Sequence, residues 1–459
     1  MNRTQNEKVN ALLESWKEDY ATMLNRWLSI PSLKAEPQEH APFGPQVRRM
    51  LDTAMQDAQA MGFETRIFDG YAGDVTLQGA SDEAIAVLAH LDVVPAGDGW
   101  KTDPFVPTRV GDRIYARGTG DDKGPALCSL FAMKAIREAG IPLRRSIRLI
   151  LGCDEESGWE DMDYYTSHTQ MPEVGFSPDA SFPLINTEKG MLGIAAHAKV
   201  ASEGLQVKEL MTGERTNVIP GESVAIVEGG EETASKVRAY AEKTGLPYSA
   251  EITDRGVRIT ATGIPGHSAY PEGCRNAIGM MLLVLKELGV QGAIRTLADV
   301  YGCEHNGASL GIACKDRISG PLTCNMGILH LRNGEIHCSF DNRCPIEADL
   351  EHLRDTLIAH IPGFTIDSVK MTAPHHVPED SELVTCLLAA YTEESGLTGA
   401  PESTGGGTYA KVLKQGVAFG AGFPGDEDLA HQANEYVDLD KMILSAKIYA
   451  NALLRLCAE

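Results

Sequence analysis

The sequence of 459 residues lacks several features that would each indicate a particular class of protein. It has no run of Lys or Arg, and 64 acidic residues outnumber 41 basic ones, for a formal net charge of −23. This charge argues against a nucleic acid or an anionic membrane as partner. No stretch approaches the roughly 18 apolar residues of a membrane span, and the first twenty residues lack the apolar core of a signal peptide. We therefore expect a soluble, cytoplasmic protein.

Paired cysteines are also absent. The ten cysteines occur singly, without any C-x-x-C pair. In a long chain without a secretion signal, such cysteines are expected to be reduced thiols that pack as small apolar residues. Cys153 has a second interpretation, because it lies beside a run of acidic residues and could be redox-sensitive there.

Apolar residues are plentiful, and their pattern predicts an α/β domain. They make up 43% of the chain, whose length favours two or three domains. Helical spacing predicts an amphipathic helix over about 9–28. The apolar run 84–90, the helix 125–140 and the strand in "RSIRLILG" then alternate, which predicts a largely parallel sheet.

The pattern changes near residue 185 and returns near residue 380. Between them, segments such as "EITDRGVRITATG" indicate shorter strands, and helices are predicted over 276–289 and 349–361. This mixture is typical of an α+β unit. A helix over 382–394 and a final helix over 439–456 resume the α/β pattern. We predict one α/β domain, residues 1–184 and 381–459, interrupted by an inserted α+β domain, residues 185–380.

Polar residues gather at the predicted strand ends. "GCDEESGW" places Asp154, Glu155 and Glu156 directly after a strand. Adjacent carboxylates repel and are costly to remove from water, so they are expected on a solvated loop unless a cation holds them. "AHLD" places His90 and Asp92 at the carboxyl end of the strand 84–90, where open α/β sheets bind ligands. Alone, either residue could equally be a cap or a satisfied polar group.

Further histidines and carboxylates follow in separate segments. "RGTGDDKG" contains Asp121 and Asp122 in a glycine-rich turn before a helix, "FSPDASFP" contains Asp179, and "LAHQANE" contains His431 and Glu435. Neutral imidazole and carboxylate suit a hydrolytic zinc or manganese site. One such group from each of the five segments, in chain order His, Asp, Glu, Asp and His, would give five ligands. This exceeds the three that one catalytic zinc usually takes, but a shared carboxylate could serve two metals about 3.5–4 Å apart.

In this order and spacing, the motifs "HLD", "RGTGDDKG", "DEESG", "FSPDASFP", "GHSAYPE" and "HQANE" resemble those of the co-catalytic zinc metallopeptidases related to aminoacylase and carboxypeptidase G. With "GGGTYAK" and the long insert, the chain most resembles their bacterial PepV-like dipeptidase branch. The resemblance runs from the first helix to the last. It implies a metal-dependent dipeptidase that acts on dipeptides with a free amino terminus. It also implies two divalent ions, with Zn²⁺ favoured and Mn²⁺ as the alternative.

The resemblance implies a ligand set for these ions. Asp121 would bridge the two metals, with His90 and Asp179 completing one site. Glu156 and His431 would complete the other site.

Catalytic roles follow from the same resemblance. Glu155 would be the general base that deprotonates the bridging water, and Asp92 would orient the imidazole of His90. His267 in "GHSAYPE" would donate to the oxyanion, although it could instead be a turn histidine. A cis peptide bond between Asp121 and Asp122 is also implied.

Substrate-binding residues can be suggested as well. Asn217 and Arg343 stand where PepV-like enzymes contact substrate, and a guanidinium suits a terminal carboxylate. Backbone donors of Gly406, Gly407 and Thr408 could form a nest for the same carboxylate. The arginine or the glycine loop could instead be structural.

Alternative functions fit the sequence less well. "GASLG" matches G-x-S-x-G around Ser309, but no strong strand precedes it, which argues against a serine hydrolase. "GTGDDKG" matches neither nucleotide-binding motif. An N-acyl-amino-acid deacylase or carboxypeptidase of the same superfamily remains the main alternative, because it would use the same metals and base.

The length of the insert suggests an oligomeric state. About 195 residues exceed the roughly 100 that a single lid domain would need, and the pattern of the insert predicts two strand-rich halves, one around "TNVIP" and one around "GHSAYPEG". PepV-like enzymes resemble a dimer folded into one chain, whose enlarged lid supplies the oxyanion histidine in cis. We therefore predict a monomer with His267 acting in its own chain and hinges near residues 185 and 380.

Overall fold

The computed structural model describes residues 3–458, which form two compact units. The first unit consists of Met1–Asn186, His376–Glu402 and Gly407–Glu459, and the second of Thr187–His375 and Ser403–Gly406. The short piece Ser403–Gly406 belongs with the second unit, although the sequence placed it in the first domain. The reason is a tertiary hydrogen bond to the second unit, in which Arg343 Nη1 donates to the Gly405 carbonyl oxygen over 2.6 Å.

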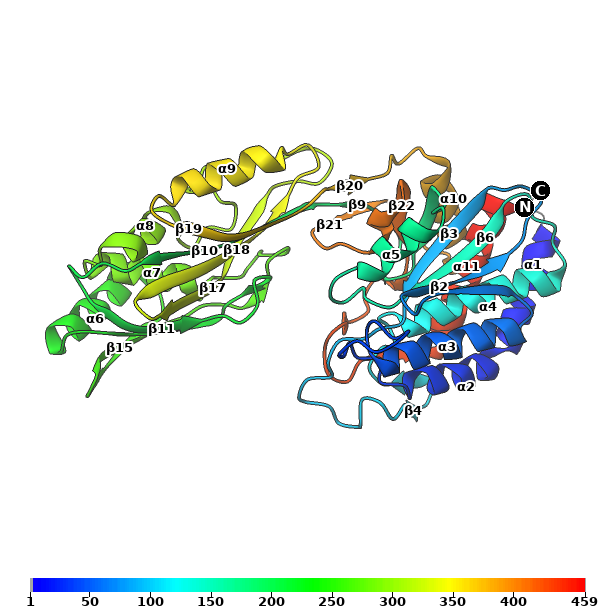
Figure 1. The fold of residues 1–459 in the computed structure, drawn as a ribbon, viewed down its shortest axis with the longest axis horizontal. Helices are drawn as coiled ribbons and strands as arrows, with labels where there is room; N and C mark the ends of the chain where they lie inside the picture. Colours follow the sequence, from blue (N-terminus) through cyan, green and yellow to red (C-terminus); the bar gives the residue numbers. More distant parts are fainter. Residues whose placement is uncertain (1–2, 459) are drawn as a thin grey trace. The chain divides into compact units, whose positions relative to one another are not determined.

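A nine-stranded mixed sheet forms the centre of the first unit (Figure 1). Its strand order is β1 (Glu64–Phe68), β2 (Ala72–Leu77), β6 (Ser146–Gly152), β3 (Ala84–His90), β7 (Val174–Ser177), β22 (Gln415–Ala418), β9 (Ile185–Glu188) and β20 (His375–His376), with β21 (Glu402–Thr404) paired to β9. The central strands β6, β3, β7 and β22 are parallel to one another, as predicted.

Both faces of the central sheet are covered, which explains the continuous apolar run of β3. Ile85 and Val87 point into the main core, while Ala86 and Leu88 pack in a second core with Tyr165. Two-sided burial of parallel strands requires apolar residues at successive positions. The polar residue His90 therefore stands out at the end of this strand.

Helices supply the covering layers of the first unit. They are α1 (Arg3–Ser15), α2 (Lys17–Leu28), α3 (Pro45–Ala60), α4 (Lys123–Ala139), α5 (Glu160–His168), α10 (Glu382–Ser395), α11 (Leu439–Cys457) and the 3₁₀ helix η1 (Tyr409–Val412). The prediction of one helix over 9–28 was wrong, because the chain breaks at Trp16 between α1 and α2. The Trp16 ring lies against Phe131 of α4 and under the Lys134 ammonium, so a tertiary contact accompanies the break.

The second unit contains one antiparallel sheet of eight strands (Figure 1). Its order is β14 (Tyr248–Thr253), β15 (Gly256–Thr262), β13 (Glu222–Val227), β11 (Val207–Thr212), β17 (Thr323–Arg332), β18 (Glu335–Cys344), β10 (Gly190–Lys199) and β19 (Thr365–Thr372). The two strand-rich halves expected from the sequence are thus joined, because β13, which follows "TNVIP", pairs with β15, which precedes "GHSAYPEG".

A hydrophobic core lies on one face of this second sheet. The second unit has four helices, α6 (Glu231–Thr244), α7 (Ala277–Glu287), α8 (Gly292–Val300) and α9 (Leu350–His360). Residues of β10 alternate between buried and partly exposed along most of the strand, the pattern of a sheet with one solvated face. Shorter pairings are β12 (Val218–Ile219) with β16 (Gly266–His267), β8 (Ala180–Ser181) with β23 (Ala421–Gly422), and β24 (Tyr436–Asp438) with β5 (Arg113–Tyr115) and β4 (Thr108–Val110).

Two expectations from composition concern membrane spans and thiols. Within residues 3–458, none of the helices combines the length and apolar character needed to cross a membrane. The ten cysteines are all free, as expected, and Cys153 is buried. Burial, and then the nearby Asp161, raise the pKa of the Cys153 thiol well above its usual value. This disfavours the reactive thiolate, and with it the redox interpretation.

Candidate metal centre

Asp121 lies between two histidines in the first unit. His90 is the last residue of β3, and its Nε2 atom is 2.9 Å from Asp121 Oδ1 and 3.7 Å from Asp179 Oδ2. On the other side, His431 Nε2 is 3.1 Å from Asp121 Oδ2 and 2.9 Å from the Glu156 carboxylate. The structure thus brings the five predicted ligands into one cluster, with each oxygen of Asp121 facing a different imidazole.

The electrostatics of this cluster favour bound cations. Burial, and then Asp121, raise the pKa of Asp179 to about 7. Burial also raises the pKa of Glu156, against the hydrogen bond with His431. For Asp121, burial is outweighed by the hydrogen bonds with His431 and His90, which lower its pKa. Carboxylates gathered away from water in this way repel one another unless positive charge compensates them.

The donor atoms also suit divalent ions in number and spacing. Two groups, His90–Asp121–Glu156 and His90–Glu155–Asp179, each present ligand atoms that lie within 4.8 Å of one another. Imidazole nitrogen and carboxylate oxygen are ligands of catalytic zinc and manganese. The residues present therefore fit a site for divalent metal ions.

The acidic segment after β6 is held by two buried carboxylates. Asp161 accepts from the backbone N–H groups of Cys153 (2.6 Å) and Asp154 (2.9 Å). Asp92 accepts from those of Glu155 and Glu156, each over 3.2 Å. The chain direction at the strand end, and hence the position of both glutamates, is fixed by these bonds.

Close packing at the end of β6 requires a glycine. A Cβ atom at Gly152 would lie 2.5 Å from both Asp161 Oδ2 and the Tyr409 hydroxyl. The first member of the acidic triplet has a different environment from the other two. Asp154 is buried, and its Oδ1 atom forms an ion pair with Lys34 Nζ at 2.6 Å. The triplet is therefore not one solvated acidic loop.

Asp92 contacts the imidazole of His90, as the resemblance implied, and it does so mainly through its backbone. The Nδ1 atom of His90 is 3.0 Å from the backbone oxygen of Asp92 and 3.5 Å from its carboxylate oxygen. The nearer acceptor is thus the carbonyl, while the carboxylate binds the backbone of the glutamates. The peptide bond between Asp121 and Asp122 is cis, as the resemblance implied.

Glu435 has a structural role that the sequence did not indicate. Its carboxylate accepts from Arg117 Nη1 (2.8 Å) and from the backbone N–H groups of Gly118 (3.1 Å), Gly120 (2.8 Å) and Asp121 (3.3 Å). The only signal in the sequence is that this acid stands four positions after the predicted ligand His431.

Comparison with known proteins identifies the family. Residues 86–455 match the model of Peptidase family M20/M25/M40. The chain belongs to this family. It is therefore a hydrolase that acts on peptide bonds. Metallopeptidases of this family use divalent metal ions. The fold class expected from the sequence, an α/β catalytic domain with an inserted α+β domain, agrees with that of the family.

Curated relatives and solved structures extend the likeness over nearly the whole chain. "Putative dipeptidase YtjP" of Bacillus subtilis is 35% identical over 453 residues, covering 96% of this chain and 97% of the relative. "Putative dipeptidase SSP1012" of Staphylococcus saprophyticus is 32% identical, covering 94% of this chain and 96% of the relative. Among structures, human carnosine dipeptidase 1 has a TM-score of 0.58 at 17% identity, covering 98% of both chains. Dug1p of Saccharomyces cerevisiae has a TM-score of 0.59 at 13% identity, also with 98% of both chains covered.

The residues predicted to donate hydrogen bonds to the oxyanion and to the substrate carboxylate lie mainly in the second unit of this M20 enzyme. His267 is exposed in β16, opposite Val218 of β12. The backbone oxygen of Asn217 accepts from Ser268. Arg343 is buried, and its Nε atom donates to Asp341 over 3.0 Å. Within this unit, the guanidinium thus already has a carboxylate partner.

The predicted glycine nest is divided between the units. Gly406 belongs to the second unit, and its N–H donates to Thr404 Oγ1 over 3.0 Å. Gly407 and Thr408 belong to the first unit, where the Thr408 side chain caps η1. The nest remains a prediction.

The serine hydrolase alternative gains no support. Ser309 lies in a turn rather than after a strand. Its hydroxyl donates to Glu304 over 3.0 Å, so its described partner is a carboxylate and not a histidine base.

Proposed function

We propose that this M20 enzyme is a dipeptidase in which Asp121 would bridge two divalent ions, with Zn²⁺ favoured and Mn²⁺ as the alternative. The observation that carries the proposal is the position of Asp121, with one oxygen 2.9 Å from His90 and the other 3.1 Å from His431. The names of the most similar curated relatives support the substrate class. His90 and Asp179 would hold one ion, and Glu156 and His431 the other.

The bound ions would lower the pKa of a water molecule and polarise the peptide carbonyl. Glu155 would act as the general base. Burial raises the pKa of its carboxyl well above the usual range, which suits a group that takes up and returns a proton near neutral pH. Its carboxylate would accept the proton of the attacking water as the water oxygen bonds to the carbonyl carbon. The same proton would then pass to the leaving nitrogen as the C–N bond breaks.

Asp92 would fix Glu155 for this step. Its carboxylate binds the backbone of Glu155 and Glu156, and its carbonyl oxygen faces His90. A base must keep its position while its charge changes, so these bonds favour efficient proton transfer.

The second unit would act as a lid over the substrate. His267 would donate to the oxyanion, and Asn217, Arg343 and the backbone of Gly406, Gly407 and Thr408 would bind the substrate carboxylate. We also infer that the enzyme is cytoplasmic, with which its acidic composition is consistent. We infer that it is a monomer, because one chain carries both units.

A substrate panel tests this function. Ala-Ala and Xaa-His dipeptides should be hydrolysed by the metal-loaded enzyme, while their N-acetylated analogues should not, because a dipeptidase recognises a free amino terminus. Metal content is measured on the same samples. Preference for the N-acetylated substrates would identify a deacylase of the same family, and activity without bound metal would contradict the proposed chemistry.

A further inference from the structure

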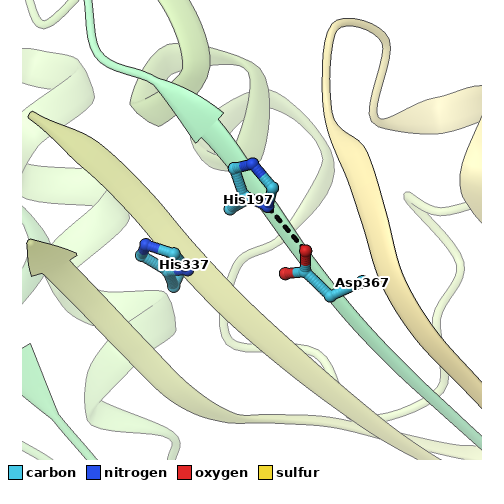
Figure 2. A group of neighbouring side chains, drawn as sticks. All are labelled: His197, His337 and Asp367. Atoms are coloured by element: carbon cyan, nitrogen blue, oxygen red, sulfur yellow. Dashed lines mark hydrogen bonds and ion pairs between the residues drawn. The ribbon is translucent and has the colours of Figure 1, made fainter.

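A second group of possible metal ligands lies in the second unit, apart from the cluster around Asp121. Figure 2 shows its three side chains, His197 of β10, His337 of β18 and Asp367 of β19. His197 Nδ1 lies 2.7 Å from Asp367 Oδ1. The two imidazole rings are stacked, with 5.3 Å between centroids and 26° between planes.

Strand register places these side chains on one face of the sheet. His197 and His337 are direct partners in the antiparallel pair of β10 and β18, and directly opposed residues share a face. The pairing of β10 with β19 shifts at Ala195 and Ala196, which oppose Ser368 and Ile366. Asp367 is therefore the extra residue of a β-bulge. Such a bulge re-aims a side chain, and here it directs the carboxylate toward His197.

This face is the one that the helices leave uncovered. Along β10, Ala196 and Ala198 point into the core, so His197 between them points outward. The side chains of His197 and Asp367 are 26% and 41% exposed. The group is accessible to an ion from solvent, yet it is partly shielded from water.

Hydrogen bonding leaves His337 available as a ligand. Among residues 3–458, the ring nitrogens of His337 have no hydrogen-bond partner. The next histidine on the same face, His330 of β17, differs in this respect. Its Nε2 atom lies 2.8 Å from the Gly213 oxygen, and its Nδ1 atom lies 3.0 Å from Arg332 Nη2. His330 is therefore engaged elsewhere.

We propose that His197, His337 and Asp367 bind one divalent transition-metal ion of the zinc type. One ligand atom from each residue lies within 4.8 Å of the others. Two ligands that are each about 2.1 Å from zinc are at most about 4.2 Å apart, so small ring rotations would suffice. Two imidazoles with one carboxylate favour zinc, copper or nickel over calcium or magnesium, which prefer oxygen ligands.

The site is tested by counting bound zinc in the full-length enzyme. The protein is dialysed against a range of Zn²⁺ concentrations, and zinc per chain is measured by elemental analysis. His337→Gln and Asp367→Asn should each bind one equivalent fewer than the wild type. His330→Gln, the matched control on the same face, should bind as many as the wild type.

Further readouts separate this site from the catalytic cluster. His337→Gln should keep its dipeptidase activity and its circular dichroism spectrum, since neither the cluster nor the core is altered. In the wild type, added Zn²⁺ should shift the side-chain NMR signals of His197 and His337 together. Equal zinc content in wild type, His337→Gln and Asp367→Asn would overturn the proposal, as would NMR shifts confined to other histidines.

Discussion

Arg117 donates through Nη1 to Glu435 Oε2 over 2.8 Å, and the two side chains are only 1% and 2% exposed. The residues are far apart in the sequence, yet they form a buried ion pair next to the candidate metal centre. Glu435 also accepts from the backbone of Gly120 and Asp121. The pair therefore holds the loop that presents the proposed bridging carboxylate.

Glu435→Gln should lower the free energy of unfolding by about 3–5 kcal/mol, because it leaves the buried Arg117 without its charge partner. Chemical denaturation monitored by circular dichroism measures this loss. The exposed Glu427 provides a control, since Glu427→Gln should change stability little. The double variant Arg117→Met/Glu435→Gln should lose less than the sum of the single variants. Strictly additive losses would mean that the pair does not act as a unit.

Glu155 and Glu156 are neighbours with different proposed roles, and matched variants can separate them. Glu155→Gln should keep both metals but reduce turnover by roughly 10²–10⁴-fold, the range for loss of a general base. Glu156→Ala should instead bind less metal, because it removes a ligand. Turnover and metal content are measured on the same preparations. Near-normal turnover of metal-loaded Glu155→Gln would show that another group is the base.

Local patterns predicted polar residues at strand ends, and the family resemblance selected the proposed ligands among them. The apolar run of β3 predicted a buried strand, and His90 at its end marked the edge where α/β sheets bind ligands. Contacts between distant segments were not predictable in the same way. Nothing near Glu435 in the sequence shows that its carboxylate receives N–H groups from residues 118–121. Likewise, Asp161 reads as an ordinary acid in the first turn of a helix, because its bonds to the preceding strand end depend on the folded chain.

Asp161 should make stability depend on pH. Burial is the main cause that raises the pKa of its carboxyl to about 7 in the folded protein, against a usual value near 3.8. The folded state therefore binds this proton more tightly than the unfolded state. Its contribution to stability is fully present below about pH 4 and is lost as pH rises toward 7, by about 1 kcal/mol per pH unit.

Asp161→Asn should remove this contribution. Urea denaturation of the wild type and the variant between pH 4.5 and 8, in the same chelating buffers, should show a shallower decline of unfolding free energy for the variant. Asp163 lies on the same helix but is exposed, so Asp163→Asn should retain the wild-type slope. Parallel pH profiles for wild type and Asp161→Asn would show that Asp161 does not titrate in this range.

Whether one chain is sufficient for activity can be tested by mixing inactive variants. The proposed metal ligands and Glu155 all belong to the first unit, and His267 belongs to the second unit of the same chain. If His267 acts in its own chain, light scattering should give about 49.5 kDa at every concentration. Glu155→Gln and His267→Ala should each be nearly inactive, and mixing them should restore nothing, because each chain would still lack one essential group. If His267 instead served a partner subunit, a mixed dimer would contain one site with both groups intact. Recovered activity in the mixture would therefore exclude a monomeric enzyme and show that the site is shared between two chains.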